Sequence, residues 1–98
     1  MTDLKTWDIA EQLESEEDMR LYLEAAFEDG DPDLIRHAIG DVARARGMTA
    51  IAQQAGISRA GLYRALGDGG NPTLGTLAAI LASFGLRLSV APVKPELA

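Results

Sequence analysis

Two arginines, Arg59 and Arg64, lie in a short segment that begins at Ser58. The guanidinium group of arginine carries forked hydrogen-bond donors that fit the O6 and N7 acceptors of guanine in the major groove of DNA. If the segment is a helix docked in that groove, its N-terminal and outward residues face base edges. Those residues are Ser58, Arg59, Ala60, Tyr63 and Arg64. Their chemistry is hydrogen bonding to bases, and nothing in the sequence indicates catalysis.

Three polar residues near this segment are better suited to the DNA backbone. Thr49 and Gln53 lie in the preceding helical segment, and Asn71 lies in the following loop, whose backbone amides are also exposed. Phosphate contacts fix the position of a protein on DNA but do not read the sequence directly. We therefore expect Thr49, Gln53 and Asn71 to position the protein without specifying a site.

The spacing between residues 49 and 66 is that of a helix-turn-helix. Two short helices, 49–55 and 58–66, are separated only by Gly56 and Ile57. Such a pair needs a small residue where the helices touch and a glycine where the backbone reverses, and Ala52 and Gly56 meet these needs. The alternative for Arg59 and Arg64, that they are merely solvated, is disfavoured by this motif. The side chains expected to hold the pair together are Ile51, Ala55, Ile57, Leu62 and Ala65.

Glycine at position 61 is a departure within the expected recognition helix. It weakens a helix by about 1 kcal/mol relative to alanine and provides no side chain to read a base. We therefore expect low specificity at that position.

Three further helices complete an all-α, phage-repressor-like fold of five helices. Capping residues, apolar stripes and terminal glycines predict them at 15–30, 31–47 and 73–85. Residues 86–91 alternate apolar with polar, which predicts a short strand, and its simplest partner is the same strand of a second copy about a two-fold axis. We expect one domain over 1–98, with a loosely attached lead-in at 1–14 and a frayed tail at 92–98.

The formal charge is distributed unevenly along the chain. Residues 1–33 contain twelve acidic and two basic residues, a charge of −10, whereas residues 34–98 contain seven basic and three acidic residues, a charge of +4. This asymmetry predicts a basic partner for the front third and an anionic partner for the rest. The alternative for the acidic segment is a surface that only keeps the protein soluble.

Several kinds of site are excluded by residue type. The chain has no cysteine, and His37 is its only histidine, so neither thiolate metal sites nor a histidine-based triad can form. The acidic residues at 29–33 fail the calcium-loop pattern, and the glycines at 67–70 lack the lysine of a phosphate-binding loop. We expect no enzyme activity, metal or cofactor. Without a membrane span or signal pattern, a cytoplasmic location is expected.

Several segments in order resemble the addiction-module antidote family, antitoxins with a Cro/phage-repressor type helix-turn-helix. The resemblance covers about residues 7–91. The segments that carry it are Asp29-Gly30-Asp31-Pro32, Gly40-Asp41-Val42-Ala43-Arg44-Ala45-Arg46-Gly47-Met48, Ala55-Gly56-Ile57-Ser58-Arg59, Leu62-Tyr63-Arg64-Ala65-Leu66, Gly70-Asn71-Pro72-Thr73 and Gly85-Leu86-Arg87-Leu88.

This resemblance implies two roles. Members bind operator DNA to repress their own toxin–antitoxin operon, and they neutralise a toxin encoded beside them, usually a small basic protein of the RelE/ParE-like kind. We expect a homodimer on DNA, with the toxin contacting the acidic front, at Glu16, Glu17, Arg20 and Glu24. Two alternatives remain open: a stand-alone phage-type repressor without a toxin, and an interaction module that has lost DNA binding.

Overall fold

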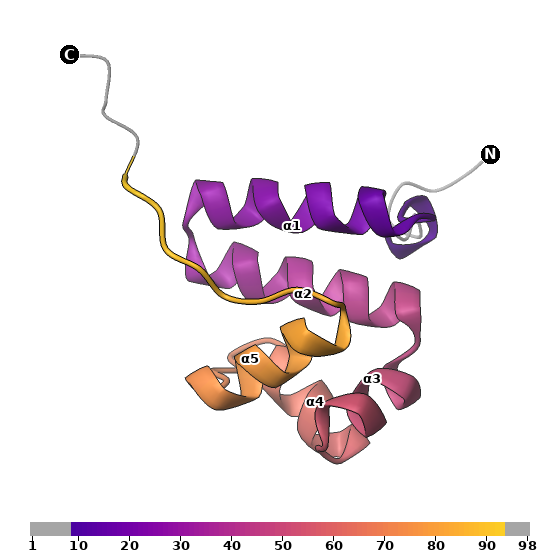
Figure 1. The fold of residues 1–98 in the computed structure, drawn as a ribbon. Helices are drawn as coiled ribbons and strands as arrows, with labels where there is room; N and C mark the ends of the chain where they lie inside the picture. The colour runs from indigo at the N-terminus through magenta and orange to yellow at the C-terminus, as the bar shows by residue number, and fades with distance from the viewer. Residues whose placement is uncertain (1–8, 94–98) are drawn as a thin grey trace.

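The computed structural model describes residues 9–93, in which five α-helices follow a single 3₁₀ turn (Figure 1). This confirms the prediction of an all-α chain with five helices. Within this part, no helix has the length and apolarity that crossing a membrane requires. Trp7 of the lead-in and the last residues of the expected frayed tail lie outside the described residues. The elements are η2 (Ile9–Gln12), α1 (Glu16–Asp29), α2 (Pro32–Arg46), α3 (Met48–Ala55), α4 (Arg59–Leu66) and α5 (Leu74–Ser83).

Side-chain caps fix where most of these helices begin. The Ser15 hydroxyl accepts a hydrogen bond from the Asp18 amide at 3.0 Å, and the Asp18 carboxylate accepts one from the Ser15 amide at 3.3 Å, which completes a capping box. α3 begins at Met48, one residue earlier than expected. Gly47, whose φ is +103°, ends α2 and starts α3 without a side-chain cap.

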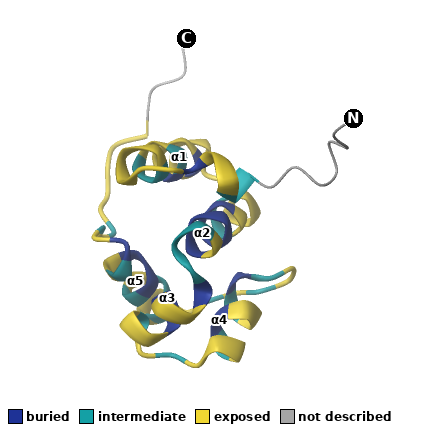
Figure 2. Cartoon of the chain, turned by 90° about the vertical axis from the view of Figure 1, so that its right-hand side faces the viewer, coloured by how far each residue is buried: buried dark blue, intermediate teal, exposed yellow. Residues whose placement is uncertain are grey.

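Helix α2 is the centre of the molecule. It contacts η2, α1, α3 and α4, while α5 packs on α3. Figure 2 shows the buried surfaces of the helices turned toward one another, with α2 between α1 and α4. The largest fully buried apolar side chains come from four different helices: Ile39, Val42, Ile51, Leu62 and Ile80.

The strand predicted at residues 86–91 is wrong for the chain as the structure describes it. Residues 86–93 form no regular secondary structure. In Figure 1 they cross the view at the level of α2 and pass the C-terminal end of α1, and residues 86–89 line a pocket together with α1. Leu86 and Leu88 pack on the core, whereas Arg87 and Ser89 are exposed. The first half of the alternation therefore reflects a segment buried on one side, whereas Val90 is 96% exposed. A strand also needs a neighbour to pair its backbone groups, and residues 9–93 provide none.

Part of the expected lead-in at 1–14 lies against the core in the residues that the structure describes. The Leu13 side chain is 8% exposed and belongs to the hydrophobic core, and η2 contacts α2. The few apolar residues before Ser15 were too short a pattern to predict this docking.

Candidate functional site

The turn between α3 and α4 has the backbone reversal that the glycine spacing predicts. Gly56 has φ +75°, and the amide of Ile57 donates to the carbonyl of Ala52 at 3.0 Å. Ala52 is 3% exposed, so the small residue lies at the buried junction. Ile51 and Leu62 are also buried, whereas Ala55, Ile57 and Ala65 are partly buried. These contacts hold the two short helices against each other.

The outer surface of α4 carries the residues that we expect to face bases. Arg59, Ala60, Tyr63 and Arg64 are all exposed, and Arg64 forms no ion pair with any residue in 9–93. Ser58 is exposed too, but its hydroxyl oxygen already accepts a hydrogen bond from the Gly61 amide at 2.9 Å. Ser58 therefore caps α4, and only its hydroxyl proton remains for another acceptor.

The side chains of Arg59 and Tyr63 contact each other. The guanidinium carbon lies 5.1 Å from the centre of the Tyr63 ring, and the Arg59 Nη2 donates to the Tyr63 hydroxyl at 3.3 Å. This is a cation–π contact between residues one turn apart on the helix. The sequence placed both residues on one surface but did not predict that they pair.

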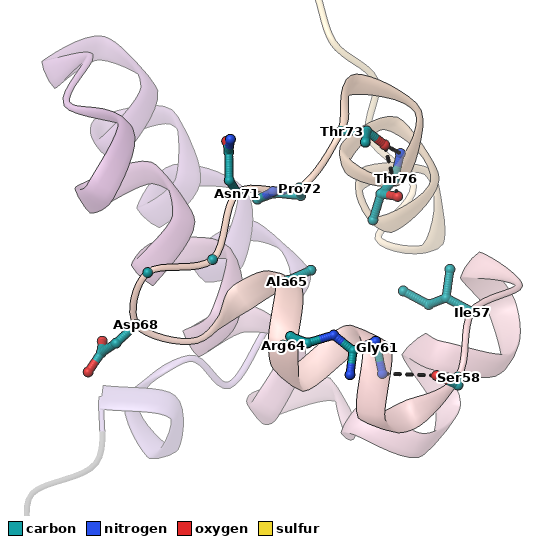
Figure 3. Close-up of a pocket in the computed structure, with 12 residues that line it drawn as sticks. Ile57, Ser58, Gly61, Arg64, Ala65, Asp68, Asn71, Pro72, Thr73 and Thr76 are labelled. Atoms are coloured by element: carbon teal, nitrogen blue, oxygen red, sulfur yellow. Dashed lines mark hydrogen bonds between the residues drawn. The ribbon is translucent and has the colours of Figure 1, made fainter.

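A hollow of about 460 Å³ lies between α4 and the beginning of α5 (Figure 3). Arg64 and Gly61 line it from α4, Asn71 from the loop, and Thr73 and Thr76 from α5. Of the three residues expected to contact phosphates, Asn71 lines the same hollow as Arg64, but its side chain points away from Arg64 (Figure 3). Thr49 and Gln53 are exposed on α3 and do not line the hollow.

A second surface lies on α1, where the expected toxin contacts form one stripe. At about 100° per residue, Glu16, Glu17, Arg20 and Glu24 fall within a sector of about 100° on one side of the helix. The three glutamates are exposed. Arg20 donates to Glu17 at 3.2 Å and to Glu24 at 2.6 Å, and the hydrogen bond and charge of Glu17 contribute most to raising the Arg20 pKa. Glu16 lies 3.8 Å from Arg46 of α2 instead. The stripe itself keeps a net negative charge because it contains three carboxylates and one guanidinium.

The two surfaces are separate. α1 and α4 make no contact, and α2 lies between them (Figure 1). A molecule bound to the α1 stripe and a molecule bound to α4 would therefore approach from different directions.

A buried carboxylate on α2 forms a hydrogen bond with α1, the helix that carries the acidic stripe. Asp41 of α2 is fully buried, accepts a hydrogen bond from the Tyr22 hydroxyl of α1 at 2.5 Å, and pairs with Arg44. His37 Nε2 is 3.8 Å from the same carboxylate, although its side chain is mostly exposed. Burial, with the hydrogen bond to Asp41, raises the pKa of Tyr22 to about 12.

Sequence analysis missed the role of Asp41. The available signals were its apolar neighbours on α2 and an arginine three residues later. They were too weak to separate Asp41 from the exposed acids nearby, because its burial results from the packing of α1 against α2.

Comparison with known proteins identifies the family. The model of a family described as "Probable addiction module antidote protein" matches residues 3–92. A protein of Haemophilus influenzae, described as uncharacterized, is 47% identical over 87 residues, which cover 89% of this chain and 90% of that protein. No solved structure gives a significant match. The chain therefore belongs to the family of probable addiction module antidote proteins.

Proposed function

We propose that this protein is the antitoxin of a type II toxin–antitoxin module with two binding surfaces. Through a phage-repressor-like helix-turn-helix formed by α3 and α4, it binds operator DNA as a homodimer and represses its own operon. Through the α1 stripe, it neutralises a RelE/ParE-like toxin. The observation that carries this proposal is the family match over almost the whole chain, residues 3–92.

The charge of α3 and α4 supports the DNA-binding half. Neither helix contains an acidic residue, although the chain as a whole has a formal charge of −6. Arg59 and Arg64 stand exposed on the outer surface of α4, where a docked recognition helix faces the major groove. The proposed base contacts are Ser58, Arg59, Ala60, Tyr63 and Arg64, and the proposed phosphate contacts are Thr49, Gln53 and Asn71.

The acidic stripe supports the toxin-binding half. Complementary charge accelerates association and favours correct partners. A small basic toxin would meet the exposed carboxylates of Glu16, Glu17 and Glu24, with Arg20 holding two of them in place. The RelE/ParE-like class of this toxin rests on the family resemblance of the sequence.

Growth rescue tests the toxin-binding half. The product of the neighbouring gene is expressed in cells together with the wild-type chain or with a variant carrying Glu16→Lys, Glu17→Lys and Glu24→Lys. We expect the wild type to restore growth and the variant to fail, because three attractive contacts become repulsive.

A matched control variant distinguishes the effect of the location of the substitutions from the effect of the changed net charge. Glu11→Lys, Glu14→Lys and Asp68→Lys change the charge by the same amount at exposed sites outside the stripe, and this variant should restore growth. Equal rescue by both variants would contradict the assignment of the stripe. If no gene for a small basic protein adjoins this one, a stand-alone phage-type repressor becomes the better interpretation.

A further inference from the structure

We propose that the two arginines of α4 have different tasks on DNA. In place of the base contacts proposed above for both arginines and for Tyr63, Arg59, held by the ring of Tyr63, reads a guanine, whereas Arg64 binds a backbone phosphate at the hollow between α4 and α5. This division rests on the proposed DNA-binding function and assigns each residue a separate measurable effect.

The geometry of the helix separates the two side chains. They are five residues apart, which at about 100° per residue places them about 140° apart around the helix. A helix about 10–12 Å across nearly fills a major groove about 12 Å wide. The middle of its outer surface then faces the base edges, and its flanks face the sugar–phosphate walls. Two arginines so far apart therefore do not point at the same base edge.

Tyr63 prepares Arg59 for base contact. The ring lies 5.1 Å from the guanidinium carbon, and the hydroxyl accepts a hydrogen bond from Nη2 at 3.3 Å. Nη2 carries a second hydrogen, so a fork of Nη2 with Nη1 or with Nε remains available, and a guanine accepts two such donors at O6 and N7. Restricting the side chain before binding reduces the entropy lost on DNA. Tyr63 is thus a positioning residue for Arg59.

Arg64 lies on the flank toward α5. Figure 3 shows its side chain running along α4 toward Gly61, and its Nη2 would lie only 3.9 Å from a Cβ at that glycine. Gly61 also lines the hollow, where a Cβ would make an ordinary contact with Arg64. Asn71 and the threonines at 73 and 76 line the other side.

The hydrogen-bonding groups of the hollow suit a phosphate better than they suit a base. Arg64 has no acidic partner within residues 9–93, and the one acid that lines the hollow, Asp68, points away from Arg64 (Figure 3). The Arg64 guanidinium supplies several hydrogen-bond donors at the α4 side of the hollow, whereas the Asn71 side chain points away from Arg64 (Figure 3). A phosphate presents only acceptor oxygens on its exposed edge, so these donors match it.

Equilibrium binding of the full chain to two duplexes separates the tasks. One duplex carries the DNA immediately upstream of the gene, and the other has the same length and composition in shuffled order. Affinities are measured by fluorescence anisotropy between about 50 and 200 mM salt. The two readouts are the ratio of the affinities for the two duplexes and the slope of log affinity against log salt.

The variants are expected to change different readouts. Arg59→Lys should lower the affinity ratio about 10- to 100-fold, because lysine keeps the charge but loses the fork that guanine needs. Tyr63→Leu should lower the ratio in the same direction, and Tyr63→Phe should retain most of it because the ring remains. Arg64→Ala should weaken binding to both duplexes equally and reduce the salt slope by about 0.9. Arg64→Lys should restore that slope, because a phosphate needs only the charge.

Circular dichroism melting confirms that each variant is folded before its affinity is compared. An affinity ratio lowered as strongly by Arg64→Lys as by Arg59→Lys would overturn the division, and so would an unchanged salt slope for Arg64→Ala. If the wild type prefers the upstream duplex but the variants give either of these two contradicting results, only the division between Arg59 and Arg64 fails. A wild type without preference for the upstream duplex overturns both the operator function and the division.

Discussion

Asp41 is a charged residue in the interior that remains stable because both of its oxygens have partners. Oδ2 accepts from the Tyr22 hydroxyl and Oδ1 from Arg44. An unpaired carboxylate in this position would cost several kcal/mol, roughly the penalty of burying an uncompensated ion. Since Tyr22 belongs to α1 and Asp41 to α2, the pair joins the helix that carries the acidic stripe to the centre of the fold.

The ionisation of Tyr22 tests this pair. Its pKa is raised from 10.0 to about 12, first by burial and then by the hydrogen bond and charge of Asp41. Because the folded pKa lies above the unfolded value, the contribution of Tyr22 to stability is complete below about pH 10 and is lost as the pH rises toward 12.

The measurement is an ultraviolet titration of tyrosinate, combined with denaturation at the same pH values. Tyr22→Phe should remove the transition near pH 12. Asp41→Asn should shift the Tyr22 pKa downward, because it removes the negative charge while leaving the ring buried. Normal ionisation of Tyr22 in the folded wild type would contradict the role of the pair.

Single residues differ in how well the sequence predicts them. The exposure of Arg59 and Arg64 followed from their positions on a short amphipathic helix. The contact of Arg59 with Tyr63 and the burial of Asp41 did not, because one depends on side-chain conformation and the other on how two helices pack. Residue type and spacing alone do not determine either.

At the scale of elements, helix boundaries were predictable because local signals determine them. Ser15 and Thr73 cap the helices that follow, and Gly30 ends α1 with φ +88°. The segment 86–91 was not predictable in the same way, because its alternating pattern is shared by strands and by extended segments buried on one side. Whether residues 86–91 form a strand or a segment buried on one side depends on the tertiary position of α1 beside them.

Two glycines are expected to respond oppositely to substitution by alanine. A Cβ at Gly40 in α2 would make ordinary contacts, the nearest at 3.6 Å, so Gly40→Ala should stabilise the protein by up to about 1 kcal/mol through helix propensity. A Cβ at Gly70 would lie 2.3 Å from the carbonyl oxygen of Ala65, so Gly70→Ala should destabilise it by about 1–3 kcal/mol.

Urea denaturation of both variants beside the wild type gives the two free energies of unfolding. The pair also tests the close approach of the loop to the end of α4, on which the shape of the hollow depends. Equal stability of Gly70→Ala and the wild type would show that the loop is not held there.

At the scale of the whole molecule, the overall charge conceals two different surfaces. A chain of formal charge −6 looks unsuited to DNA, yet α3 and α4 contain no acid, and α1 carries the exposed acidic stripe. The charge asymmetry between segments was readable from the sequence. The separation of the two surfaces in space was not, because it depends on how α2 is packed between α1 and α4.

The exposed surface of α4 is proposed to bind operator DNA. The affinity of the Arg59→Ala/Arg64→Ala double variant for the DNA upstream of the gene tests this binding. Both side chains are exposed, so the variant should fold and melt like the wild type. We expect its binding to the upstream duplex to be abolished, because both guanidinium contacts are gone. Wild-type affinity in the folded double variant would contradict the claim.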